Sequence, residues 1–309
     1  MVTAKVYSAA YIGFEGKLIE VECDTTNGLP GIVIVGLANK AIDEAKERMR
    51  SSIKNSGLVM PRKRITLNLA PADLPKDGSC YDLPMAVAVL AASQQIQKSL
   101  LKDSLFVGEL SLDGSLRPVR GIITHTEVAK SQGFQRIFVP ELSAAQATLV
   151  EGIDVIPVAS LTQLCRHLNK EKPIPAAVHV VTESSKSTNL IDFADIYGQE
   201  HAKRALEIAV AGHHNIHLSG PPGAGKTMMA RALLSIMPRP SKDEVIAITK
   251  LHSLAGEITD EVRHERPFRS PHHTSSSVAL IGGGKNPKPG EISLAHKGIL
   301  FLDELPEYT

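Results

Sequence analysis

The chain has 309 residues, of which 43% are hydrophobic, and its formal net charge at pH 7 is +1. This length allows about two domains with ordinary cores, and the near-neutral charge excludes a general basic field, so any DNA contact must be local. Three widely spaced cysteines, Cys23, Cys80 and Cys165, lack metal-type pairing and indicate a reducing compartment. Because no run of 18 apolar residues and no signal peptide occurs, we expect a cytoplasmic protein without a membrane partner.

The first 168 residues predict a compact α+β domain. Strands bounded by Gly, Pro and turn residues are expected at 5–13, 17–25, 31–37, 64–69, 136–140 and 155–158. Helices are expected at 39–56, 82–92, 122–131 and 161–168, with a further short helix between the last two strands. The segment 82–92 is apolar on nearly all sides, which predicts a buried helix. Residues 105–116 predict a hairpin that turns at Asp113 and Gly114.

Two stretches of this part resemble the proteolytic domain of Lon-type proteases, a ribosomal S5 domain 2-like fold. They are PADLPKDGSCYDLPMAVAVL at 71–90 and FVGELSLDGSLRPVRGI at 106–122. The resemblance places the family's nucleophilic serine at Cys80 and its dyad lysine at Ile123, so neither residue is present. Because a thiol without a neighbouring base is largely unactivated, we interpret residues 1–168 as a Lon-like, non-proteolytic domain for assembly or partner docking. An active Lon-like protease remains an alternative.

Residues 169–190 carry Pro, Ser, Thr and Lys with little periodicity and predict a linker. The second predicted domain, 191–309, opens with a turn at Tyr197-Gly198 and an amphipathic helix at 199–211. A short apolar strand at 216–219 and a helix at 228–236 then flank a turn rich in Gly and Pro.

That turn fits the P-loop spacing, in which four residues separate Gly220 from Gly225, Lys226 and Thr227. Backbone N–H groups of such a loop bind polyphosphate at a helix N-terminus, and glycines leave room for the phosphates. Lys226 is expected to contact the β- and γ-phosphates and Thr227 to bind Mg²⁺. The predicted nucleotide-binding residues are Gly220, Pro221, Pro222, Gly223, Ala224, Gly225, Lys226 and Thr227. The alternative is a glycine-rich turn without a ligand.

The segment GILFLDE at 298–304 is an apolar run that ends in two acids. It predicts a buried parallel strand that presents Asp303 and Glu304 at its carboxyl end, where ligands bind in α/β sheets. Asp303 is expected to hold the water shell of Mg²⁺. Glu304 is expected to act as the general base, and Lys226 is the other expected catalytic residue. A strand that enters a solvated loop is the alternative.

Residues 266–307, with the P-loop and the Lon-like part before them, resemble magnesium-chelatase-like AAA+ proteins of the YifB/ComM type. The resemblance covers essentially the whole chain and implies an α/β fold with an AAA+ domain, ATP and Mg²⁺ as cofactors, and a homo-hexameric motor. For competence-linked members it implies helicase or branch-migration activity on single-stranded or branched DNA in natural transformation. A chelatase-type ATPase that remodels a protein partner for metal insertion is the alternative, although chelatase motor subunits lack a Lon-like domain.

Residues 281–290, IGGGKNPKPG, predict a mobile surface loop. Lys285 and Lys288 are candidates for contact with the DNA backbone without base readout, and a solvated loop is the alternative. His272 and His273, with His252 and His264 nearby, lack the spacing of a zinc site. As strand neighbours, His272 and His273 would point to opposite faces, and we expect them to hydrogen-bond within 266–307.

The chain ends shortly after Glu304, whereas the AAA+ resemblance implies two further strands, a sensor residue, an arginine finger and a helical lid. In that fold, one missing strand would lie between the P-loop strand and the strand carrying Asp303. Its absence would leave backbone groups unpaired along both strands. We therefore expect a truncated chain in which residues 1–168 fold well, while the AAA+ part is partly disordered and hydrolyses ATP poorly.

Overall fold

The computed structural model describes residues 3–35, 41–72, 74, 79–178, 191–258, 260–284 and 287–308. The chain divides into two compact units. The first comprises Met1–Val180 with Ser253–Val262, and the second comprises Val181–His252 with Arg263–Thr309. Among the described residues, no helix is both long and apolar enough to cross a bilayer.

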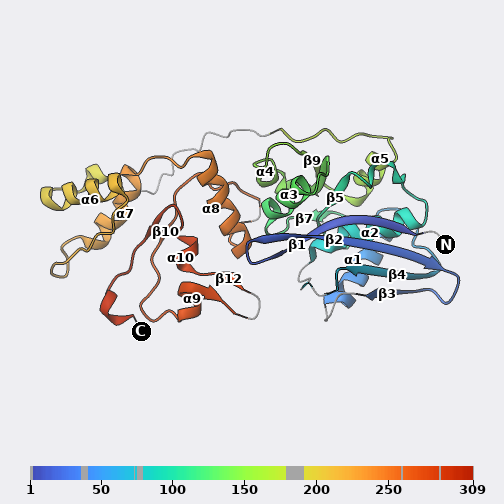
Figure 1. Ribbon diagram of the computed structural model, residues 1–309, viewed down its shortest axis with the longest axis horizontal. Helices are drawn as coiled ribbons and strands as arrows, with labels where there is room; N and C mark the ends of the chain where they lie inside the picture. The colour runs from blue at the N-terminus through green and yellow to red at the C-terminus, as the bar shows by residue number, and fades with distance from the viewer. Residues whose placement is uncertain are drawn as a thin grey trace. The chain divides into compact units, whose positions relative to one another are not determined.

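The first unit is built on a seven-stranded mixed sheet with the order β3-β4-β2-β1-β5-β8-β9 (Figure 1). The antiparallel part consists of β1 (Ala4–Ile12), β2 (Glu15–Thr26) and β4 (Arg64–Ala70). The strands that pair in parallel with this part or with one another are β3 (Gly31–Val35), β5 (Ser104–Phe106), β8 (Arg136–Pro140) and β9 (Asp154–Val158). The alternating sequence of β4 places Ile65, Leu67 and Leu69 in the core, where all three are fully buried.

Five α-helices accompany this sheet: α1 (Ala41–Asn55), α2 (Asp82–Ala92), α3 (Ile122–Ser131), α4 (Ala144–Ala147) and α5 (Leu161–Leu168). Every residue of α2 is buried, and the helix packs on β1 and β2, which confirms the prediction from its apolar sequence. On neighbouring parallel strands, Phe106 and Phe138 stack with ring centroids 4.7 Å apart. The mixed α/β architecture expected from the sequence is therefore present.

The predicted hairpin at 105–116 is only partly correct. Leu105 and Phe106 are fully buried and belong to β5, which pairs in parallel with β1 and β8. The hairpin is shorter and consists of β6 (Glu109–Leu110) and β7 (Leu116–Arg117), with a turn around Gly114. Leu105 and Phe106 gain more from burial in the central sheet than from a local hairpin.

Part of the expected linker contacts the first unit. Ile174 is buried, and the Ala177 N–H donates a hydrogen bond of 2.7 Å to the carbonyl of Val155 on β9. The remaining linker residues, 179–190, lie outside the described residues.

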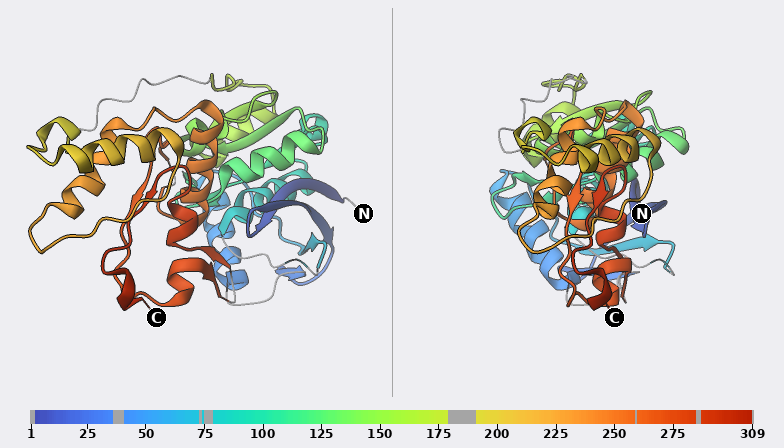
Figure 2. Two further views of the ribbon diagram at one scale, coloured as in Figure 1. Left: turned by 60° about the vertical axis from the view of Figure 1, so that its left-hand side comes forward. Right: turned by 90° about the vertical axis from the view of Figure 1, so that its left-hand side faces the viewer.

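The second unit contains the helices α6 (Glu200–Gly212), α7 (Lys226–Ile236), α9 (Ser277–Ile281) and α10 (Glu291–Leu294), and most of α8 (Lys242–Ala255), whose last residues, 253–255, belong to the first unit (Figure 2, yellow to red). Its buried apolar cluster consists of Phe193, Ile196, Leu206, Met229, Ala232 and Leu233. Short strands pair β10 (Phe268–Arg269) with β13 (Ile299–Leu300) in parallel, and β11 (Gly282–Gly283) with β12 (Lys288–Pro289) in antiparallel fashion.

The predicted strand at 216–219 is not formed. These residues are not assigned to a strand, most of them are exposed, and no described segment pairs with them. A strand needs a neighbouring ladder for its backbone groups, and an apolar tetrapeptide alone cannot supply one. The buried strand predicted within 298–304 is present only as β13, which is parallel as expected but only partly buried.

Candidate nucleotide-binding site

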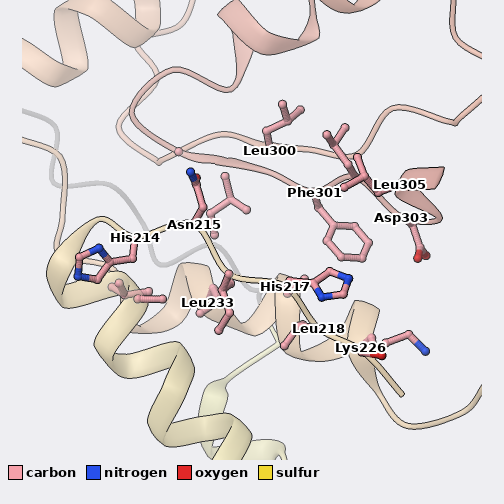
Figure 3. Close-up of a pocket in the computed structure, with 18 of the residues that line it drawn as sticks. His214, Asn215, His217, Leu218, Lys226, Leu233, Leu300, Phe301, Asp303 and Leu305 are labelled. Carbon is pink, nitrogen blue, oxygen red and sulfur yellow. The ribbon is translucent and has the colours of Figure 1, made fainter. Parts of the chain in front are cut away.

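A cavity of about 900 Å³ lies in the second unit between the P-loop segment and the residues that follow β13. Its walls come from residues 213–220, from α7 and from residues 298–306. Figure 3 shows Lys226 and Asp303 in this region, with His217 and Phe301 beside them. Residues from two segments that the sequence analysis assigned to one site therefore line a single cavity.

The P-loop residues form the turn that leads into α7. Gly223 and Gly225 both have φ +82°, a left-handed conformation that disfavours other residues. A Cβ added at either position would meet no heavy atom within 4 Å, so both glycines are required by conformation and not by crowding. Gly225 is the N-cap of α7 and has no side chain to satisfy the first N–H groups of the helix. These groups remain available for an anion, which fits the expected position of nucleotide phosphates.

Lys226 begins α7 and folds back over the loop. Its Nζ donates hydrogen bonds to the carbonyls of Gly220 at 2.9 Å and Pro221 at 3.1 Å. Thr227 is the next residue of the helix, and its side chain is exposed. A phosphate that binds Lys226 would replace these two carbonyls with a charged partner, which forms a stronger hydrogen bond.

Asp303 and Glu304 follow β13 and line the same cavity as Lys226. Both are exposed, so they lie in a solvated turn and not at the end of a buried strand. Glu304 has φ +53°, and its N–H donates to Asp303 Oδ1 at 3.1 Å. The two carboxylates thus occupy adjacent positions beside the cavity.

His273 was expected to hydrogen-bond within 266–307, but the sequence did not indicate its partner, Glu304. Its Nδ1 lies 3.0 Å from Glu304 Oε2, and its ring lies 4.1 Å from that of His272. The rings are therefore neighbours, and the expectation that they point to opposite faces is wrong because residues 271–274 form a turn and not a strand. His272 Nδ1 lies 2.9 Å from the hydroxyl of Thr274, which confirms hydrogen bonding within this segment.

The expected loop at 281–290 contains a two-stranded hairpin. Gly282 pairs with Pro289 and Gly283 with Lys288, whose side chain is exposed. A Cβ at Gly290 would lie 2.4 Å from the Gly282 nitrogen, so the base of the hairpin depends on direct backbone contact. Lys285, the other candidate for DNA contact, lies outside the described residues.

In the first unit, the two positions that correspond to the Lon dyad belong to the core. Cys80 is 9% exposed, and burial raises the pKa of its thiol to about 12. Ile123 is fully buried. Near neutral pH, Cys80 is therefore a protonated thiol, which is a poor nucleophile.

Both units match known protein families. The family described as "Magnesium chelatase, subunit ChlI" matches residues 192–309, and "Subunit ChlI of Mg-chelatase" matches residues 21–143. The competence protein ComM of Haemophilus influenzae is 45% identical over 312 residues, which cover 100% of this chain and 61% of ComM. The uncharacterized protein YifB of Salmonella typhimurium is 45% identical over 309 residues, which cover 100% of this chain and 60% of YifB.

An archaeal Lon protease of Methanocaldococcus jannaschii is 26% identical over 170 residues, which cover 52% of this chain and 26% of the protease. The chain spans about three fifths of the length of ComM and YifB. The agreement over its full length with ComM and YifB, and of both units with magnesium-chelatase families, leads to one assignment. The chain belongs to the magnesium-chelatase-like AAA+ family of the ComM/YifB type.

Proposed function

We propose that this chain binds Mg²⁺-ATP in the cavity of the second unit and belongs to an ATP-driven motor that acts on DNA. The observation that carries the nucleotide site is the convergence of Lys226, Asp303 and Glu304 on one cavity beside an uncapped helix N-terminus. The chelatase-like AAA+ family of the chain supports the same chemistry. Because the chain spans about three fifths of the length of ComM and YifB, the motor activity is proposed for a protein of their length.

Each side chain has a distinct role in the proposed reaction. The N–H groups at the start of α7 and the charge of Lys226 would hold the phosphates, and a bound Mg²⁺ would supply further neutralisation of their charge. Thr227 and Asp303 supply the oxygen ligands that Mg²⁺ prefers. Glu304 accepts a proton from the attacking water. His273, 3.0 Å from Glu304, fixes the direction of that carboxylate.

The proposed coupling to DNA rests on the relationship to a competence protein. We propose that the motor is a homo-hexamer that remodels single-stranded or branched DNA, with the exposed Lys288, and Lys285 beside it in sequence, on phosphates of the backbone. The first unit serves assembly or docking without proteolysis, which the buried thiol of Cys80 and the apolar Ile123 support.

The decisive experiment measures ATP turnover without DNA, with single-stranded DNA and with a branched DNA junction. Stimulation by DNA that Lys226→Ala abolishes would support the DNA motor. A rate that responds to a protein partner and not to DNA would favour a chelatase-type remodelling ATPase instead.

A further inference from the structure

A second cavity, of about 280 Å³, lies in the first unit. It opens between the start of β3, the last turns of α1 and the segment that leads into β4. We call it the basic pocket, and its lining residues are Pro30, Gly31, Ile32, Arg50, Lys54, Leu58, Met60, Pro61, Arg62, Lys63 and Ile65. None of the site residues considered above belongs to it.

All charged side chains that line the basic pocket are positive. Arg50, Lys54, Arg62 and Lys63 line it, and none of its lining residues is acidic. Arg50 shares its charge with Glu47, whose carboxylate lies 3.3 Å away. Within the described part of the chain, no carboxylate lies at ion-pair distance from Lys54, Arg62 or Lys63. For a chain of net charge +1, such a cluster around a hollow concentrates positive potential at one place.

The backbone that follows α1 caps part of its C-terminal end. Its last carbonyls would carry partial negative charge if they were unpaired. Three of them, at Ser52, Ile53 and Lys54, accept backbone N–H groups from Ser56, Leu58 and Gly57 respectively. This pairing reduces the negative charge that the end of the helix would otherwise present to an anion.

The interior of the basic pocket is apolar and contains no aromatic ring. Ile32, Leu58, Met60 and Ile65 line it between the charged side chains. Without an aromatic side chain, the pocket cannot stack a base, which is the usual way to hold a single strand by its bases. Cations around an apolar surface instead fit a chain of alternating phosphate and sugar groups, in which the phosphates meet the charges and the sugars meet the apolar side chains.

We propose that the basic pocket binds the phosphodiester backbone of a nucleic-acid strand, without regard to its sequence. This inference rests on the proposed DNA function, which makes DNA the polyanion that the chain encounters. It adds a contact in the first unit that is independent of the nucleotide site and of the hairpin carrying Lys288.

The test uses the whole chain without nucleotide and a fluorescent single-stranded oligodeoxythymidylate. The variant Lys54→Ala/Arg62→Ala/Lys63→Ala is compared with Lys102→Ala/Lys130→Ala/Lys172→Ala, which removes the same charge from exposed positions elsewhere in the first unit. The pocket variant should flatten the slope of log affinity against log salt by about 2, at about 0.7 for each lost phosphate contact with a single strand. The control variant should keep the wild-type slope.

A second readout locates the contact. In a lysine-acetylation experiment followed by mass spectrometry, bound oligonucleotide should protect Lys54 and Lys63 but not Lys102 or Lys130. Binding with equal slopes for both variants and no protection of Lys54 and Lys63 would overturn the pocket while leaving the proposed function intact. A wild-type chain that binds no oligonucleotide would reject both. Displacement by polyglutamate but not by inorganic polyphosphate would assign the pocket to an acidic peptide and also overturn the proposal.

Discussion

Replacing Asp82 with Asn should change how the stability of the first unit depends on pH. Asp82 begins α2 and is 1% exposed. Its carboxylate accepts a hydrogen bond of 2.7 Å from Arg48 Nε and one of 3.3 Å from the Leu110 N–H. Burial raises the pKa of this carboxyl to about 6, although Arg48 and the Leu110 N–H both act to lower it. The cost of burying the charge therefore exceeds the gain from pairing it.

The magnitude follows from the two pKa values. The pKa rises from an ordinary value of 3.8 to about 6 in the folded protein, and each pH unit corresponds to about 1.4 kcal/mol, which gives about 3 kcal/mol. Because the folded pKa is the higher one, the folded state binds the proton more tightly. The associated stability is fully present below about pH 4 and is lost as the pH rises through about 6. Asn cannot ionise, so the stability of Asp82→Asn relative to wild type should rise by about 3 kcal/mol between about pH 4 and pH 7.

The cysteines provide an assay for this unit alone. Cys23, Cys80 and Cys165 all lie in the first unit and are buried, so a thiol reagent reaches them when that unit unfolds. A pulse of dithiodipyridine, which reacts in acid as well as at neutral pH, can be applied across a urea series. Asp154→Asn, which replaces an exposed carboxylate on β9, is the control. A stability difference for Asp82→Asn that does not change with pH, or changes with the opposite sign, would refute the reasoning.

Three further predictions concern the site and the backbone. Lys226→Ala should weaken ATP binding about tenfold or more by removing a charge-assisted contact, and unchanged affinity in calorimetry would reject the assignment. Glu304→Gln should preserve ATP binding and slow hydrolysis, whereas normal turnover would assign water activation to another residue. Gly121→Ala should destabilise the first unit more than its control, Gly133→Ala, for which a cost of about 1–2 kcal/mol is expected. Both glycines have positive φ, but only a Cβ at position 121 would lie 2.8 Å from Leu254 Cδ2. Equal urea midpoints would show that Leu254 moves away without cost.

Local pattern was sufficient to predict most elements of the first unit. The bounds of α2, α3 and α5 agree with the sequence prediction residue by residue. The separate role of β5 could not be predicted in this way. Its pairing with β1 joins segments far apart in the chain, and a short apolar run is compatible with a hairpin or a sheet strand.

In the candidate site too, local features were predictable from the sequence, whereas contacts between distant segments were not. The P-loop was predictable because its glycines, its lysine and its helix start are consecutive in sequence, and the loop bonds of Lys226 stay within six residues. The contact between His273 and Glu304 was not predictable, since it joins two turns without regular spacing. The strand expected at 216–219 failed for a related reason, because its formation depends on a neighbour and not on its own apolar residues.

The burial of Cys80 and Ile123 also has a thermodynamic consequence. A dyad at these positions would require an amine in place of Ile123, and an amine with no exposed surface is forced towards its neutral form at the expense of stability. Isoleucine at the same place contributes about 1.5–3 kcal/mol of apolar burial. Many enzymes accept a less stable fold in order to keep a reactive group in their interior. At positions 80 and 123 the first unit avoids that compromise, because a protonated thiol and an apolar side chain occupy them.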